Sequence, residues 1–389
     1  VPLSEHQAIA ARRAGCELID VSDLGAIRCA EPHVRFPDDL YLSWAMLDAF
    51  VRQARQTPGR PAVLSLRRTA DTDRLAATQD VELTDSDMCY PVRYVVPGND
   101  APPHPTRIDV EDGFRIRKRL PAHVLPAGEV THHVTAKSTL QIVTPMHLHL
   151  ASMVAILNRV AAWSPSGVMG HALKLAQWVG SRLPRSASEP TAHASAPPAL
   201  FYKYLATRNE IGKNCDIHPS AVLEGCVLGD NVRVGAGSYL QFCHLGDNVD
   251  ISPCACVLSS CIGHDTQLVT REWISLSVIY PGCFAAPRYM QFGFVGRDAQ
   301  VYPSMYYDFR LDGKPLKTRF RGALVDAGFP FLGPIIGHRA KVAGGLSLGP
   351  GRMVPNGVTV LPNPDTVVDR IPADLEEGAV IHAGRPIER

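Results

Sequence analysis

Aliphatic residues and glycines recur along the second half of the chain with a fixed period of 17 residues. Within each unit, further aliphatic residues follow in steps of six, six and five. A fixed period predicts a solenoid, because one repeat cannot bury its own apolar face and must stack on the next. We therefore expect coils of three short strands around a narrow apolar core. Each unit opens on an aliphatic residue and a glycine: Ile211-Gly212, Leu228-Gly229, Leu245-Gly246 and Ile262-Gly263.

This period is interrupted once before it resumes at Ile336. The interruption contains Asp312-Gly313 between two alternating segments, which is a strong hairpin signal. We expect an arm at residues 305–321, within an excursion that spans residues 305–335. The solenoid should end near residue 366, because the prolines that follow Val360 cannot continue the stacking.

Ten or more consecutive hexads of this kind resemble the hexapeptide-repeat superfamily of transferases. The resemblance implies a left-handed parallel β-helix that forms a homotrimer, with an active site between two subunits. It also implies acyl transfer, in which a histidine deprotonates an amine or hydroxyl that attacks an acyl thioester. The implied cosubstrate is acyl-CoA or an acyl carrier thioester, and the acceptor is a small molecule or sugar nucleotide.

The first 145 residues are expected to form a mixed α/β domain. A helix is predicted at residues 36–55, and the predicted strands lie at 16–21, 62–66, 81–83, 92–96, 107–110 and 114–118. Residues 146–200 should hold two helices, at 146–163 and 168–182, and a linker rich in Pro, Ala and Ser at 184–198. Residues 201–389 then form the solenoid domain.

This order of domains resembles sugar-nucleotide transferases that carry a C-terminal β-helix. Residues 142–151, Ile-Val-Thr-Pro-Met-His-Leu-His-Leu-Ala, are similar to the segment that leads into the helical linker of those enzymes. Their Gly-rich nucleotide loop, however, is missing from the first 40 residues here. We therefore expect the N-terminal domain to lack nucleotidyl chemistry.

Composition narrows the functional classes. The formal charge of +1 gives no global field toward nucleic acid or an anionic membrane. The most apolar helix, at 145–163, contains two histidines, Asn158 and Arg159, so we do not expect it to span a membrane. The first residues contain neither a basic stretch nor an apolar stretch, so we expect no secretory signal within this numbering. The ten cysteines show no zinc-type CxxC spacing. These features indicate a cytoplasmic protein with reduced cysteines and no metal.

The polar residues two positions after the aliphatic residue that opens each unit should form a column along one edge of the solenoid. Successive residues of this column should lie about 4.8 Å apart. Asp247 and His264 fall on successive coils, and a carboxylate beside an imidazole raises its basicity and fixes its tautomer. The histidines that match the superfamily's catalytic base are His264, His338 and His244. His244 occupies a position that leaves open whether it points into or out of the solenoid. The alternative is that these side chains only decorate a solvated edge.

A basic cluster surrounds the expected arm. Alternating cations suit the phosphates of coenzyme A or a nucleotide. Lysines that guard a sheet edge are the alternative, and Tyr306 and Tyr307 beside the cluster favour a subunit interface. The predicted anion-binding residues are Arg297, Arg310, Lys317, Arg319 and Arg321.

The sequence thus favours an acyltransferase. A non-catalytic trimeric β-helix that binds a ligand or acts as a scaffold remains the second hypothesis, and another enzyme activity on this scaffold is the third. Fold alone does not decide among them.

Overall fold

A computed structural model describes residues 3–19, 30–69, 72–73, 76, 78–110, 114–119, 129–162, 207–269, 271–310, 312–363, 380–382 and 385–387. Two compact units form. The first comprises Val1–Tyr204 with Arg310–Pro330, and the second comprises Leu205–Phe309 with Phe331–Arg389. The predicted helix at 168–182, the linker at 184–198 and the prolines at 364 and 372 lie outside the described residues.

The first unit contains a mixed sheet in the order β1-β5-β3-β6, with β4 on β5. Strand β3 pairs antiparallel with β5 and parallel with β6. Two smaller antiparallel pairs, β2–β9 and β7–β8, complete the strands before residue 145. The bounds are β1 (His33–Arg35), β2 (Leu40–Leu42), β3 (Ala62–Arg67), β4 (Glu82–Leu83), β5 (Asp87–Val95), β6 (His104–Arg107), β7 (Phe114–Arg119), β8 (Glu129–Val134) and β9 (Thr139–Gln141).

Three helices are described in this unit: α1 (Leu3–Arg13), α2 (Trp44–Arg55) and α4 (Pro145–Ala162). Helix α2 starts later than predicted, because β2 takes up the preceding residues and the Ser43 side chain caps the backbone N–H of Met46. Helix α1 was not predicted, since its short Ala-rich face carries a weak apolar pattern. The strand expected from Cys16 is absent from the described residues 16–19.

His147 is buried at the start of α4. Its Nδ1 accepts a hydrogen bond from the backbone N–H of Val143, so its Nε2 carries the proton and donates to Thr78 Oγ1 at 3.0 Å. Burial lowers the pKa of His147 to about 4. The imidazole is therefore held neutral as a structural hydrogen-bonding group.

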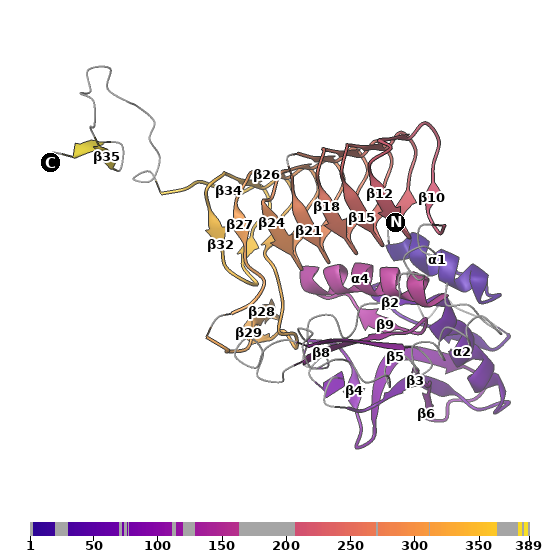
Figure 1. The fold of residues 1–389 in the computed structure, drawn as a ribbon. Coiled ribbons are helices and arrows are strands. Elements are labelled where there is room, and N and C mark those ends of the chain that lie inside the picture. The colour runs from indigo at the N-terminus through magenta and orange to yellow at the C-terminus, as the bar shows by residue number, and fades with distance from the viewer. Residues whose placement is uncertain are drawn as a thin grey trace, which may run out of the picture. The chain divides into compact units, whose positions relative to one another are not determined.

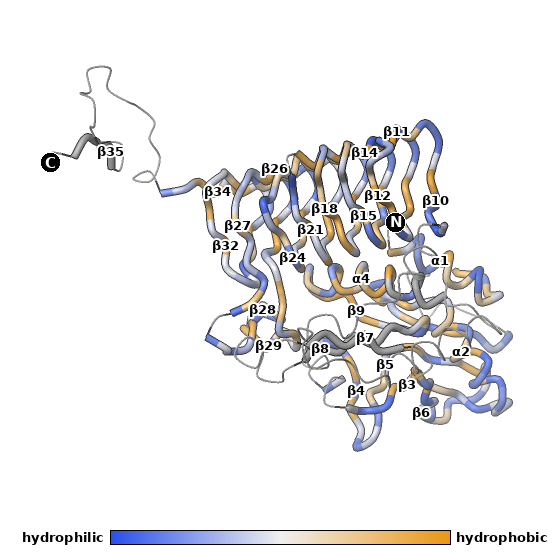
Figure 2. Tube along the Cα trace, viewed as in Figure 1, coloured by the Kyte–Doolittle hydropathy of each residue, from blue (hydrophilic) through white to orange (hydrophobic). Residues whose placement is uncertain are grey.

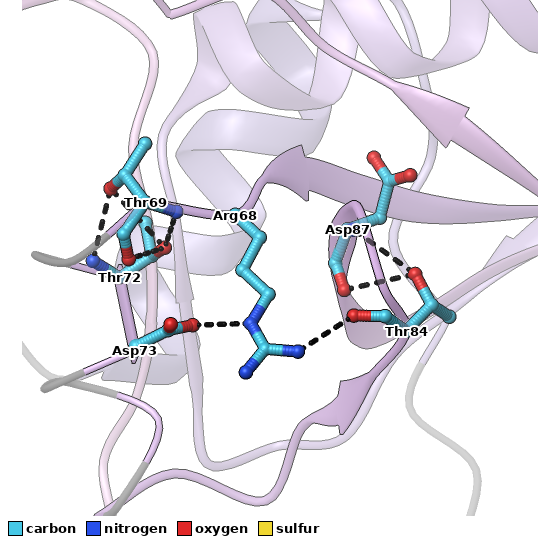
Figure 3. A network of polar contacts seen from close by, with 6 residues as sticks. All are labelled: Arg68, Thr69, Thr72, Asp73, Thr84 and Asp87. Atoms are coloured by element: carbon cyan, nitrogen blue, oxygen red, sulfur yellow. Dashed lines mark hydrogen bonds and ion pairs between the residues drawn. The ribbon is translucent and has the colours of Figure 1, made fainter.

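Asp87 organises the polar edge of the mixed sheet. Arg107 donates to both of its carboxylate oxygens, at 2.6 and 2.8 Å, and lowers its pKa to about 2. Figure 3 shows the adjoining turn, where Thr84 bonds Asp87 and Arg68 joins the Thr84 carbonyl to Asp73. The Asp87 carboxylate is thus already paired with Arg107, while the backbone of Asp87 holds this turn.

The second unit is a parallel β-solenoid, which confirms the predicted fold class (Figure 1). Its three sheets hold eight, eight and seven strands. The first sheet contains β10 (Glu210–Ile211), β13 (Val227–Leu228), β16 (His244–Leu245), β19 (Cys261–Ile262), β22 (Val278–Ile279), β25 (Phe294–Val295), β30 (Ile335–Ile336) and β33 (Met353–Val354). The second contains β11 (Asp216–Ile217), β14 (Arg233–Val234), β17 (Asp250–Ile251), β20 (Gln267–Leu268), β23 (Phe284–Ala285), β26 (Gln300–Val301), β31 (Lys341–Val342) and β34 (Thr359–Val360). The third contains β12 (Val222–Glu224), β15 (Tyr239–Gln241), β18 (Cys256–Leu258), β21 (Trp273–Ser275), β24 (Tyr289–Gln291), β27 (Met305–Tyr306) and β32 (Ser347–Leu348).

The 17-residue period sets the register of these sheets. Ile211, Leu228, Leu245 and Ile262 pair in one column, as predicted. The last three are at most 3 % exposed, whereas Ile211 is 51 % exposed because it belongs to the first coil. Apolar segments recur in successive coils in Figure 2. The repeated glycine allows close stacking, since a Cβ on Gly246 would lie 2.5 Å from the backbone nitrogen of His264.

Between the inward aliphatic residues of each coil, a smaller residue also points into the core. Its position shifts where the step between aliphatic residues is five residues and not six. Cys226 and Cys243 lie in the apolar core, at 0 % and 2 % exposure, and the residues that follow them do not. His244 is exposed on β16 and thus points out of the solenoid, which answers the question that the sequence left open. Cys261, the equivalent residue of the next coil, is likewise outside the core. The inward position falls one residue earlier, because the last step of each unit has five residues and not six.

The excursion contains a hairpin, as expected, but its turn is elsewhere. Strands β28 (Lys317–Phe320) and β29 (Ala323–Asp326) pair antiparallel around Arg321-Gly322, where φ is 47° and 82°. Two positive φ values suit a two-residue hairpin loop. Asp312, which was predicted at the turn, instead pairs with Arg310. The hairpin belongs to the first unit, where Arg321 forms an ion pair with Asp80.

One further antiparallel pair, β35 (Val380–His382) with β36 (Arg385–Ile387), follows the solenoid.

Candidate functional site

The candidate site lies at the corner between the first and second sheets, in the turn between β19 and β20. This corner carries two columns of polar residues. One contains His264 and the other Asp265, whose φ of 57° places it in the left-handed region. The same conformation recurs at Asn214, Asn231 and Asn248, as expected of asparagine in a turn, because this residue tolerates the left-handed region.

Aspartates in the first column bind the backbone of the preceding coil. Asp230 Oδ1 accepts from the backbone N–H of Lys213, and Asp247 Oδ1 accepts from that of Asp230, each at 2.7 Å. The predicted pairing of Asp247 with His264 is therefore wrong. The Asp247 carboxylate is directed toward the coil before it, whereas His264 belongs to the coil after it.

His264 pairs instead with the next residue in sequence. Its Nδ1 lies 2.7 Å from Asp265 Oδ2, and both side chains are 55 % exposed. Because a carboxylate only accepts hydrogen bonds, Nδ1 carries the proton and the neutral ring leaves Nε2 as an acceptor. This is the tautomer that a general base needs.

A ladder of side-chain amides leads to Asp265. Asn214 Nδ2 donates to Asn231 Oδ1 at 3.3 Å, Asn231 Nδ2 donates to Asn248 Oδ1 at 3.0 Å, and Asn248 Nδ2 donates to Asp265 Oδ1 at 2.8 Å. The hydrogen bond from His264, followed by that from Asn248, lowers the pKa of Asp265. The carboxylate therefore remains charged beside the imidazole over a wide pH range.

His338 adopts the opposite tautomer. Its Nδ1 accepts a hydrogen bond from the backbone N–H of Arg297 at 2.8 Å, so the proton of the neutral ring is on Nε2. The residue that follows it, Arg339, offers no acceptor, whereas Asp265 follows His264. His338 thus caps the backbone and can donate, but its neutral ring has no free basic nitrogen.

The predicted anion-binding residues fall in both units. Arg297 is exposed on the solenoid, while the other four belong to the first unit. Arg310 already pairs with Asp312, and Arg321 with Asp80 and over the Phe320 ring, so each must exchange a partner before it binds a phosphate. Lys317 is exposed, and Arg319 is not among the residues whose side chains the structure describes.

Tyr306 corrects the expected interface. We predicted that it would lie near a neighbouring subunit, but it is fully buried in the core of its own solenoid. It belongs to the inward column, where it pairs with Met290 and Leu348. Tyr307, the next residue, is 43 % exposed and remains available for contacts.

Glu272 is a buried acid that sequence reasoning missed. It is 1 % exposed, and neither of its carboxylate oxygens has a hydrogen-bond partner among the described residues. Ser238 and Ala255 occupy the same position in the two preceding coils, two residues before an inward aliphatic side chain. Burial raises the pKa of Glu272 to about 7. The signal in the sequence was an acid in a column of small residues.

Among the described residues, no group of three or more His, Cys, Asp or Glu side chains could hold a metal ion. Within the same residues, no helix is long and apolar enough to cross a membrane.

No family model matches the chain, and no curated protein matches it. The solved structures that match include the acetyltransferase domain of PglB from Neisseria gonorrhoeae FA1090 in complex with acetyl coenzyme A, at 12 % identity and a TM-score of 0.16. Another structure of that domain matches at 18 % identity and a TM-score of 0.12. The first match covers 39 % of this chain and 53 % of that chain, and the second covers 40 % and 55 %. The chain thus spans about half the length of those solved chains.

Proposed function

We propose that this protein transfers an acyl group from an acyl thioester to an amine or hydroxyl of a small molecule or sugar nucleotide. The observation that carries the proposal is the His264–Asp265 pair, which leaves Nε2 of an exposed imidazole as a base. Nε2 removes the proton from the acceptor, whose nitrogen or oxygen attacks the thioester carbonyl. The tetrahedral intermediate then expels the thiolate, which takes the proton from the imidazolium.

We further propose that the solenoid is left-handed and that three chains assemble, so that a neighbouring chain completes the site. Of the predicted anion-binding residues, Arg297 lies in the same unit as His264, and we propose that it binds the phosphates of acyl-CoA. Light scattering should give the mass of a trimer at micromolar concentration. A monomer would contradict the shared site but would leave the His264–Asp265 chemistry open to direct assay.

The test of the activity is release of free thiol from acetyl-CoA in the presence of a panel of amino and hydroxyl acceptors, including sugar nucleotides. Replacing His264 with alanine should lower turnover by roughly 10² to 10⁴, the usual contribution of general-base catalysis. His218→Ala is the matched control, because His218 is also exposed on the solenoid but pairs with Ser220. Equal turnover in wild type and His264→Ala would reject His264 as the base.

A non-catalytic trimeric scaffold is the second candidate. It is favoured by the other polar residues of the corner, since Asp230, Asp247 and His338 all bind backbone amides. On this hypothesis, no acceptor supports thiol release, and His264→Ala leaves every property of the protein unchanged.

A further inference from the structure

The amide ladder at the corner has a direction. All three asparagines donate through the side-chain nitrogen, and Asn231 and Asn248 also accept through the side-chain oxygen. The bonds shorten from 3.3 to 3.0 to 2.8 Å toward Asp265. The reverse direction would require Asp265 to donate, which a carboxylate cannot do. The charged end of the ladder therefore fixes the orientation of every amide in it.

The ladder ends at Asp265 because the next coil offers no side chain. Gly282 occupies the equivalent position, and a Cβ there would lie 2.3 Å from Asp298 Oδ1. Asp265 Oδ1 thus receives the ladder on one side, while Oδ2 binds His264 on the other. The two oxygens of one carboxylate join the asparagine ladder to the proposed base.

We propose that Asn231 and Asn248 are positioning residues that hold Asp265 so that it keeps His264 in the Nδ1-protonated tautomer. The inference rests on the proposed function for its catalytic consequence, but the tautomer itself does not depend on turnover.

The ladder is needed because the His264–Asp265 pair is exposed. With both side chains 55 % exposed, water competes for each group, and an isolated surface pair of this kind is weak. Asn248 fixes the second oxygen of Asp265 and so restricts rotation of its carboxylate. Hydrogen bonds in a chain also polarise one another, which strengthens the last bond of the series.

The opposing explanation is that the asparagines serve only as turn residues. Asparagine tolerates the left-handed conformation, as does glycine, and φ at Asn248 is 58°. Substitutions that keep this conformation but remove the amide donor separate the two explanations.

The experiment compares Asn248→Gly and Asn248→Asp with Asn214→Gly as the matched control. Glycine and aspartate both accept the left-handed conformation, and both lack the amide donor. Asn214 has the same conformation but lies at the far end of the ladder. Circular dichroism should show that all three variants remain folded.

Two readouts by nuclear magnetic resonance do not require activity. The nitrogen shifts of the His264 ring give its tautomer, and the carboxyl carbon shift of Asp265 follows its titration. Both Asn248 variants should raise the pKa of Asp265 and reduce the Nδ1-protonated fraction of His264, whereas Asn214→Gly should change neither. Unchanged tautomer and titration in both Asn248 variants would overturn the proposal.

The kinetic readout separates this inference from the proposed function. Asn248→Asp should lower kcat/KM by about tenfold, the scale of losses when a group that orients a functional side chain is removed. If His264→Ala is inactive and both Asn248 variants keep full kcat/KM with the wild-type tautomer, the ladder proposal fails alone. If His264→Ala keeps full activity, the proposed function fails, and the tautomer measurement still decides the role of the ladder.

Discussion

Glu272 should make the stability of the solenoid depend on pH. Its pKa is raised from 4.5 to about 7, because burial disfavours the charged form. Between these two values the folded state keeps a proton that the unfolded state has released. The free energy of unfolding therefore falls as pH rises from about 4.5 to about 7, and stays low above that.

The size of the effect follows from the pKa difference. A shift from 4.5 to about 7 corresponds to about 3 kcal/mol. Replacing Glu272 with glutamine keeps the shape of the side chain and removes its charge. The variant should exceed the wild type in stability by less than about 1 kcal/mol at pH 5 and by up to about 3 kcal/mol at pH 8.

Urea unfolding at pH 5, 6, 7 and 8, followed by circular dichroism, measures this difference. Hydrogen exchange of β21, which begins at the next residue, assigns the change to the correct coil. Glu224→Gln is the matched control, because the Glu224 carboxylate accepts hydrogen bonds from Tyr239 and Gln241. It should destabilise the solenoid by about 1–2 kcal/mol at both pH 5 and pH 8.

Parallel pH profiles for the wild type and Glu272→Gln would refute the reasoning. They would mean that the native protein ionises Glu272 as readily as the unfolded chain does. The carboxylate would then have a partner or contact with solvent.

Two further predictions concern the cores of the two units. Leu245→Asp should abolish folding of the solenoid, because it places an unpaired charge at a position that is only 1 % exposed. The control Leu361→Asp, at a position that is 69 % exposed, should leave the circular dichroism spectrum unchanged. The pKa of His147 is lowered from 6.5 to about 4, so the unfolded state binds the extra proton and the first unit should lose stability as pH falls from about 6.5 to about 4. Hydrogen exchange at α4 should show this loss in the wild type and a smaller one in His147→Gln; equal losses would contradict it.

The architecture of the solenoid was predictable because stacking repeats one geometric requirement in every coil. The period of 17 residues gave the register of Ile211, Leu228, Leu245 and Ile262 without any structural information. The left-handed turns at Asn214, Asn231 and Asn248 recur with the same period, so the same geometric requirement accounts for them. Periodic patterns of this kind average over many residues, so single exceptions do not hide them.

The N-terminal unit was less predictable because its elements are held by contacts between distant segments. Helix α2 begins at Trp44 because β2 pairs with β9, about a hundred residues away in sequence. The excursion shows the same limitation. Its hairpin forms at Arg321-Gly322, and its residues belong to the unit formed by the N-terminal half of the chain.

At the candidate site, the repeat spacing predicted the position of each histidine but not its hydrogen-bond partner. Spacing alone correctly placed His264 and His338 on one edge, but it assigned the wrong carboxylate to His264. The chemistry of the following residue decides the role of each ring. Asp265 offers an acceptor, so His264 donates from Nδ1 and keeps Nε2 basic; Arg339 offers none, so His338 accepts from the backbone of Arg297 instead. The role of a histidine at such a corner therefore depends both on its position in the repeat and on the residue that follows it. An acceptor in the following position leaves Nε2 free to act as a base, whereas a residue without an acceptor leaves the ring to bind a backbone N–H.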